Sequence, residues 1–198
     1  MRYSSTHKEE IRNKLLANSR AIAKRGGFES TGVDALMKAI GLTGAAFYNH
    51  FPSKQALFQS LIEAEIDHSA EMLAGVQNAS DDPVLQSLHR YLSAYHVDHP
   101  EQGCVLPTLG PEIARAAPEV RKAVESGLKR IHHYLSDQVG ESDAAWALIA
   151  QCVGALILAR SMESDEARRD ILHACRRTVD DLYQIRKNRP KAPPSVDS

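Results

Sequence analysis

The chain has 198 residues, 43% of them apolar, so it is long enough to bury a core without disulfides or structural metals. Its three cysteines are widely spaced and form no CxxC pair, which argues against a disulfide framework or zinc site and fits a reducing compartment. The net charge is −1, but residues 1–54 carry nine Lys or Arg against four Asp or Glu, a net of +5 that leaves −6 for the remainder. This asymmetry is expected when one end of a molecule meets a polyanion, although charge also varies by chance between segments of this size.

The N-terminal residues include no apolar stretch of the signal-peptide type, and the most apolar run, 146–159, is shorter than the roughly 20 residues that cross a bilayer. The sequence therefore predicts a soluble, cytoplasmic protein. No GxSxG, HExxH, phosphate-loop or GxGxxG motif occurs in the chain, so we expect no enzyme activity, no metal and no cofactor.

Apolar residues recur every three or four positions and no segment alternates like a strand, which predicts an all-α protein. A first helix is expected to end at Gly26. A short second helix should run from a cap at Thr31 to Gly41, and a short third one from a cap at Thr43 to just before Pro52. Two short helices joined by a glycine turn are typical of a helix-turn-helix unit, whose second short helix enters the DNA major groove.

The remaining elements are longer. A helix is expected from Ser53 to about Val76, then a turn over 78–83 and a helix over 84–97. Proline and glycine at 107, 110 and 111 should force a restart before the next helix.

That next helix is expected to begin at Pro118 and end at Gly140, and two closing helices should begin at Ser142 and Asp165. The polar, proline-rich tail is expected to be disordered. The predicted organisation is thus a three-helix DNA-binding domain (1–53), a larger helical domain for effector binding and dimerisation (54–187), and a tail (188–198).

Residues 27–58 read GFESTGVDALMKAIGLTGAAFYNHFPSKQALF, with a threonine opening the second helix, a glycine turn, a tyrosine, a histidine–phenylalanine pair and a lysine in one register. This stretch resembles the DNA-binding segment of the TetR family of transcriptional repressors. The resemblance implies a homodimer that binds a palindromic operator in double-stranded DNA and releases it when a small molecule enters the C-terminal domain. Over the remainder of the chain, the resemblance rests on length and helix layout.

Within the third helix, Phe47 and Phe51 should point inward, because residues four apart share one helix face. Tyr48 lies one position round from Phe47, so its hydroxyl can reach a phosphate. Lys54 offers an ammonium group at the start of the next helix. A plain surface tyrosine and a solvated lysine are the alternative interpretations.

The head of the third helix, residues 44–46, has no hydrogen-bonding side chains, so we expect strong phosphate contacts and modest reading of bases. Position and resemblance together predict these DNA-binding residues: Thr31, Thr43, Gly44, Ala45, Ala46, Tyr48, Asn49, His50 and Lys54.

The two closing helices are expected to pair with a second subunit. Small residues along 146–159 let another helix approach closely, and the large apolar side chains beside them supply area to bury. A helix buried within one subunit is the alternative. The residues expected at the interface are Trp146, Ile149, Ala150, Val153, Gly154, Ile157, Cys175, Val179 and Leu182.

An effector pocket is expected between residues 62 and 139, where the proline and glycine breaks interrupt packing. The residues proposed for its wall are Tyr91, Tyr95, His96, Cys104, Leu109, His133 and Tyr134. Cys104 lies at an expected loop-to-helix junction, where a thiolate could sense oxidants or electrophiles; an inert buried cysteine is the alternative. A helical protein-interaction module whose basic end binds an acidic partner is a further alternative function.

Overall fold

The computed structural model describes residues 5–74 and 82–187, and within these ranges the chain forms nine α-helices, two 3₁₀-helices and no strand. The predicted all-α fold is confirmed. Val76, most of the turn predicted over 78–83 and the tail 188–198 lie outside the described residues.

The N-terminal end, called the head below, contains α1 (Ser5–Gly26), α2 (Val33–Lys38) and the 3₁₀-helix η1 (Gly44–Asn49). Gly41 has a φ of 76°, a left-handed conformation that suits glycine, and it makes the turn between α2 and η1. The predicted cap at Thr31 is wrong: Gly32 occupies the N-cap position of α2, and the Thr31 hydroxyl donates instead to the carbonyl of Gly27. Thr43 occupies the N-cap position of η1 without a side-chain hydrogen bond.

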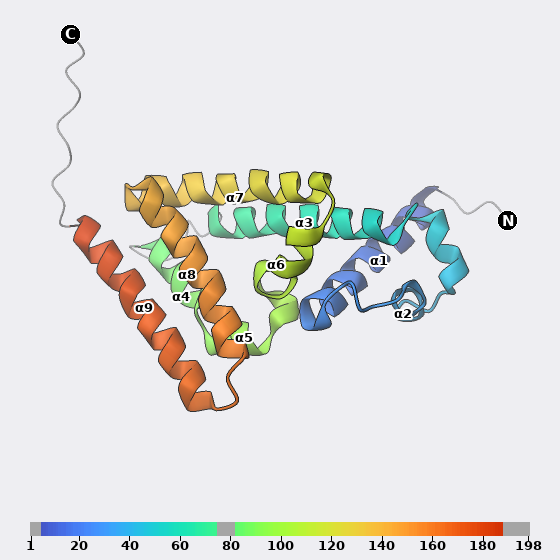
Figure 1. The fold of residues 1–198 in the computed structure, drawn as a ribbon. Coiled ribbons are helices and arrows are strands. Elements are labelled where there is room, and N and C mark those ends of the chain that lie inside the picture. The colour runs from blue at the N-terminus through green and yellow to red at the C-terminus, as the bar shows by residue number, and fades with distance from the viewer. Residues whose placement is uncertain (1–4, 75–81, 188–198) are drawn as a thin grey trace, which may run out of the picture.

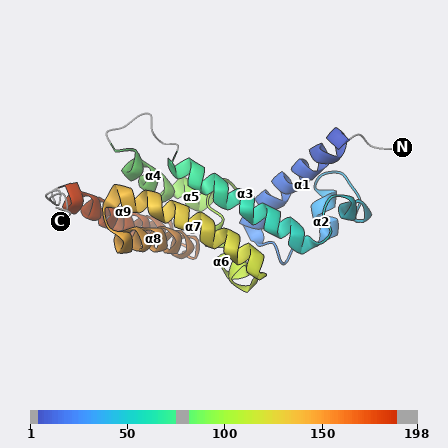
Figure 2. The same cartoon turned by 90° about the horizontal axis from the view of Figure 1, so that it is seen from above.

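The long helix α3 (Lys54–Ala74) runs from the head into the body of the protein, where α7 (Pro118–Val139) lies along it (Figures 1 and 2). Ser53 caps α3 as predicted, because its Oγ accepts the backbone N–H of Ala56 at 3.0 Å. At Gly127 the two helices approach so closely that an added Cβ would lie 1.7 Å from Cγ2 of Ile66.

Two predictions about the middle of the chain are wrong. The single helix expected over 84–97 is two helices, α4 (Pro83–Tyr91) and α5 (Ala94–Asp98), and the 3₁₀-helix η2 (Pro100–Gln102) follows. The restart expected at residues 107–111 does not occur, because α6 (Leu106–Arg115) runs through both prolines. Pro107 lies in the first turn of α6, where a backbone N–H would have no helical partner in any case.

The chain closes with α8 (Ser142–Arg160) and α9 (Asp165–Lys187), which lie side by side and begin where the sequence predicted (Figure 1). At 19 residues and a mean hydropathy of 1.6, α8 is longer than the predicted apolar run and meets the length and composition of a membrane-spanning helix. Core helices of soluble proteins meet the same criteria, and Leu148, Cys152 and Leu156 of α8 are buried in this protein's own core.

The buried side chains form two clusters. One joins the head to α3, α6 and α7, and the other lies among α4, α5 and α7–α9. Leu109 and Val124 pack in the same cluster as Phe47, so continuous apolar packing connects α6 and α7 to the head. The division into domains at residue 53 stays a prediction.

Candidate functional site

The face of the head expected to meet DNA is built on η1. Phe47 and Phe51 are 0% and 1% exposed, so both point inward as predicted. Tyr48 is 67% exposed and packs the edge of its ring on Phe47, with the ring centroids 5.4 Å apart. The ring is therefore supported by the core while its hydroxyl remains free to bind a group outside the protein.

The first residue of η1 is a glycine for a steric reason. A Cβ at Gly44 would lie 1.7 Å from Oδ1 of Asp34 in α2, so the Asp34 carboxylate fills the space that a side chain would need. Thr43, Ala45 and Asn49 are exposed near it. This surface offers small groups, backbone and two short polar side chains to a partner.

Two basic residues beside this surface bind backbone carbonyls and aromatic rings of the head. Lys54 donates its Nζ to the carbonyl of Glu29 at 2.8 Å and lies 5.0 Å from the centroid of the Phe28 ring. Arg12, which was not predicted, donates Nη1 to the carbonyl of His50 at 2.9 Å and stacks 4.0 Å over the Phe51 ring. Both cations thus stabilise the head in addition to adding positive charge beside η1.

His50 packs against this surface with its Nδ1 buried and without a hydrogen-bond partner in the described residues. Burial lowers the pKa of its ring, and the positive charge of Lys8 lowers it further. The ring is therefore neutral near pH 7 and adds no charge toward DNA.

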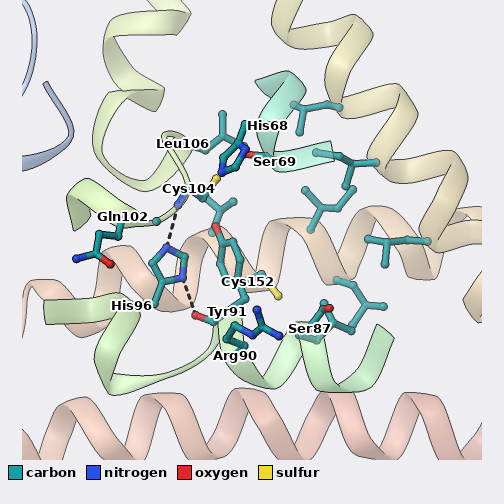
Figure 3. A pocket seen from close by; sticks show the side chains of 18 of the residues that line it. His68, Ser69, Ser87, Arg90, Tyr91, His96, Gln102, Cys104, Leu106 and Cys152 are labelled. Atoms are coloured by element: carbon teal, nitrogen blue, oxygen red, sulfur yellow. Dashed lines mark hydrogen bonds between the residues drawn. The ribbon is translucent and has the colours of Figure 1, made fainter. Parts of the chain in front are cut away.

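The body contains a cavity of about 310 Å³, partly open to solvent and lined by residues of α3 to α8 (Figure 3). Four of the seven predicted effector residues line it: Tyr91, Tyr95, His96 and Cys104. The other three do not. Leu109 is buried in the core shared with the head, His133 is exposed, and Tyr134 packs in the second core cluster.

Several residues of the cavity wall were not predicted from the sequence, notably His68, Ser87, Arg90 and Gln102. A signal for one of them was present, because Ser87 precedes Tyr91 by four residues and shares its face of α4. Ile149 and Val153, which were predicted for the dimer interface, also line the cavity.

His96 is fixed in one tautomer by its neighbours. Its Nε2 accepts the backbone N–H of Cys104 at 2.9 Å, so the proton sits on Nδ1, which donates to the carbonyl of Tyr91 at 2.9 Å (Figure 3). Burial lowers the pKa of His96 to about 4, and the positive charges of Arg160 and Lys24 act in the same direction. The ring is neutral at physiological pH.

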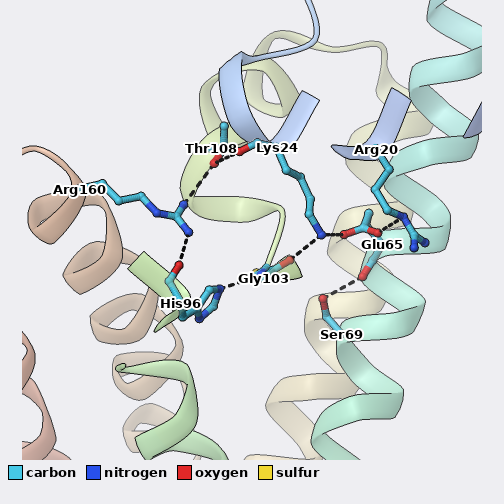
Figure 4. A network of polar contacts seen from close by, with 9 residues as sticks. Arg20, Lys24, Glu65, Ser69, His96, Gly103, Thr108 and Arg160 are labelled. Atoms are coloured by element: carbon cyan, nitrogen blue, oxygen red, sulfur yellow. Dashed lines mark hydrogen bonds and ion pairs between the residues drawn. The ribbon is translucent and has the colours of Figure 1, made fainter. Parts of the chain in front are cut away.

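A chain of polar contacts joins this wall to the head (Figure 4). Lys24 of α1 is 3% exposed and donates Nζ both to Oε2 of Glu65 in α3 and to the carbonyl of Gly103, each at 2.7 Å. The guanidinium of Arg20 pairs with the same carboxylate. Because Gly103 precedes Cys104 in the cavity wall, α1 is held directly by a segment that lines the cavity.

The outer face of the closing helices carries exposed apolar side chains. Trp146, Ile157 and Leu158 are 41%, 42% and 54% exposed, and Leu158 was not predicted. Of the interface residues predicted on α9, Val179 is buried within the single chain, while Cys175 and Leu182 pack partly against its core. The free apolar face therefore belongs mainly to α8.

Residues 15–61 match the family described as bacterial regulatory proteins, tetR family. Residues 15–61 are thus a TetR-type DNA-binding segment. They contain the second half of α1, α2, η1 and the start of α3, and they support a DNA-binding regulator of transcription.

Relatives agree with this assignment. The chain is 24% identical over 131 residues to the HTH-type transcriptional repressor NemR of Escherichia coli K12, covering 64% of this chain and 66% of NemR, just under two thirds of its length. It is 22% identical over 92 residues to IcaR of Staphylococcus aureus strain Newman, the negative regulator of the biofilm operon icaADBC, covering 46% and 49% of the two chains.

Solved structures share the fold of this chain. The reduced form of E. coli NemR superposes with a TM-score of 0.71 at 21% identity and covers 86% of this chain and 96% of NemR. A TetR regulator from Chloroflexus aurantiacus gives a TM-score of 0.74 at 20% identity, covering 88% and 96%.

Proposed function

We propose that the protein is a cytoplasmic, homodimeric repressor that binds a palindromic operator and releases it when a small molecule occupies the cavity. The observation that carries this proposal is the Lys24 contact: one lysine of α1 binds the carbonyl of Gly103, in the cavity wall. A ligand that moves Gly103 therefore moves a helix of the head. To release DNA, the ligand must bind the DNA-incompetent arrangement more tightly than the competent one.

The proposed DNA contacts follow from the exposed side of η1. Tyr48 donates its hydroxyl to a phosphate, Lys54 supplies charge nearby, and Thr43 adds a hydroxyl at the start of the helix. Ala45 offers a methyl group and close backbone approach in place of hydrogen bonds to bases. Affinity should therefore come mainly from phosphates, with specificity assisted by DNA shape.

The proposed dimer buries the exposed face of α8 against a second copy. A two-fold axis there would present two heads to the two half-sites of a palindrome. Ile157→Lys is expected to give monomers in sedimentation experiments, because it places a charge in the apolar contact. Ala114→Lys, which adds the same charge at an exposed site of α6, should leave the dimer intact.

A footprint of the purified protein on DNA flanking its own gene, repeated over a salt series, tests the proposal. We expect a protected palindrome and an affinity that falls steeply with salt. Equal binding to all sequences at every salt concentration would contradict it.

A second candidate is a redox- or electrophile-sensing regulator that acts through Cys104, favoured by the position of this cysteine in the cavity wall. Burial raises the pKa of its thiol, with smaller opposing effects from the nearby Tyr91 hydroxyl, the backbone of Leu106 and the charge of Lys24, so the protein holds it protonated rather than activated. Under this candidate, peroxide would weaken DNA binding of the parent protein and of Cys175→Ser, but not of Cys104→Ser. Unchanged DNA affinity of the parent protein after peroxide would exclude it.

A further inference from the structure

Two hydroxyl groups in the cavity wall are buried without a hydrogen-bond partner among the described residues. They are Oγ of Ser87 and Oη of Tyr91, which lie one turn apart on α4. Cys104 lies close enough to influence the pKa of Tyr91, but the two side chains form no hydrogen bond of normal geometry. Buried polar atoms in proteins nearly always have partners, so this pair marks a place where a ligand would supply an acceptor.

The charges around the cavity restrict that ligand further. No Asp or Glu occurs among the described residues of its wall, and Arg90 is exposed. His96 is uncharged, and both of its ring nitrogens are occupied by backbone groups. A cationic ligand would find no carboxylate in the wall, and an anionic ligand would meet only the exposed Arg90, whose charge is screened by solvent, so either would lose its hydration at a net cost.

The remainder of the wall is mainly apolar, and the volume that it surrounds limits the size of the ligand. Leucine, isoleucine and valine side chains of α4, α6, α7 and α8 form a large part of it, including Leu88, Leu128 and Ile131. The volume of about 310 Å³ is roughly twice that of an engineered cavity of about 150 Å³ that binds benzene. The cavity therefore has room for about two aromatic rings.

We infer that the cavity binds an uncharged, mostly apolar molecule of about two rings that carries a carbonyl or similar oxygen to accept the Tyr91 hydroxyl. This inference rests on the proposed function only in treating the cavity as the effector site. Ser87 offers a second donor one turn away on the same helix, so ligands with two acceptors fit best.

Three probes of similar size test this in the full-length protein without DNA, by calorimetry. Benzophenone has the carbonyl. Its methylene analogue, 1,1-diphenylethylene, replaces the oxygen by CH₂ at nearly constant shape, and diphenylacetate carries a negative charge. We expect benzophenone to bind about five- to tenfold more tightly than the methylene analogue, as one neutral hydrogen bond provides. Diphenylacetate should bind more weakly than both.

The variant Tyr91→Phe should abolish the preference for benzophenone and leave the affinity of the methylene analogue unchanged. Its folding is not at risk, since it removes only an unpaired hydroxyl. Tyr95→Phe is the matched control, because Tyr95 also lines the cavity but already donates its hydroxyl to Gln102 at 2.6 Å. It should retain the preference.

Equal binding of benzophenone and its methylene analogue, tightest binding of diphenylacetate, an unchanged preference in Tyr91→Phe, or no binding of any probe would each overturn the inference. Failure of the proposed function looks different. In that case benzophenone binds with the expected preference, but its saturation leaves the affinity for the footprinted DNA unchanged.

Discussion

The face of η1 and the cavity wall differ in how their functional groups are held. On η1, exposed groups such as Tyr48 are placed by neighbours close in sequence, Phe47 above all. In the cavity wall, His96 and Gly103 are held by partners on other helices or loops. Arg160 of α8 and the N–H of Cys104 bind His96, and Lys24 of α1 binds Gly103. A local pattern is therefore enough to locate the DNA-facing surface, whereas the cavity exists only once distant segments have packed.

The head and the cavity wall are joined at the buried Lys24–Glu65 pair. Breaking this pair should therefore give the largest loss in the free energy of unfolding among the predictions. Glu65→Leu leaves the ammonium of Lys24 buried with only a carbonyl as partner, and we expect a loss of about 3–5 kcal/mol in the free energy of unfolding. Urea denaturation monitored by circular dichroism measures it.

The double variant Lys24→Met/Glu65→Leu is the control, because it replaces both buried charges by apolar groups of similar volume and should recover most of the loss. A Glu65→Leu protein that loses less than about 1 kcal/mol would show that water reaches the pair and that the two regions are joined more loosely.

The second prediction concerns pH and the neutral state of His96. Its pKa of about 4 lies below the ordinary value of 6.5, so the unfolded chain binds the proton first as the pH falls. The stability that His96 contributes is therefore complete above about pH 6.5 and is lost progressively toward pH 4. The shift corresponds to about 3 kcal/mol.

His96→Gln removes this titration, so comparing unfolding free energies of the two proteins between pH 7 and pH 4 isolates the contribution of His96. The comparison with the variant is needed because burial also lowers the pKa of His50, in the head, so protonation of His50 at low pH reduces folding stability as well. Parallel pH profiles for the parent and variant proteins would show that His96 is not buried in its neutral form.

Helix boundaries set by local signals could be predicted from the sequence. Pro118 begins α7, Gly140 with a φ of 75° ends it, and Ser142 and Asp165 begin the closing helices as expected. The inward positions of Phe47 and Phe51 followed from their spacing. Each of these features depends on a residue within one turn.

The break between α4 and α5 could not be predicted, because its stabilising partner is far away in sequence. Arg176 of α9 donates to the carbonyls of Leu92 and His89, which the end of α4 leaves free. Arg160 of α8 likewise donates to the carbonyls of His96 and Val97 at the end of α5. Long-range side chains thus bind the free carbonyls at the end of each helix. One local signal was present and was missed, because Ser93 caps α5 by accepting the N–H of His96 on its Oγ at 3.2 Å.

The third prediction tests the close packing of the cavity wall. A Cβ at Gly103 would lie 1.9 Å from Nε2 of His96, so Gly103→Ala must displace the ring and weaken its bond with the N–H of Cys104. We expect a loss of about 2 kcal/mol in thermal or urea unfolding. Gly26→Ala, where an added Cβ meets nothing within 4 Å, is the control and should change stability little.

The smallest expected change in free energy comes from a substitution on the exposed face of η1. Tyr48→Phe removes one hydroxyl from η1 without disturbing the ring contact with Phe47, so folding stability should not change. If this hydroxyl binds phosphate, DNA affinity falls by about 1 kcal/mol, roughly fivefold, for all sequences alike. Because the contact is uncharged, the dependence of affinity on salt should stay the same.

Lys54→Gln is expected to behave differently, because losing a cation at a phosphate lowers the slope of log affinity against log salt concentration by about one. Tyr95→Phe, which lies far from the head, is the control and should leave DNA binding unaltered. Gel shifts at several salt concentrations distinguish the three variants. Unchanged affinity in Tyr48→Phe would mean that η1 meets DNA through Thr43, Ala45 and the backbone. The exposed surface, like the cavity wall, would then act mainly through shape.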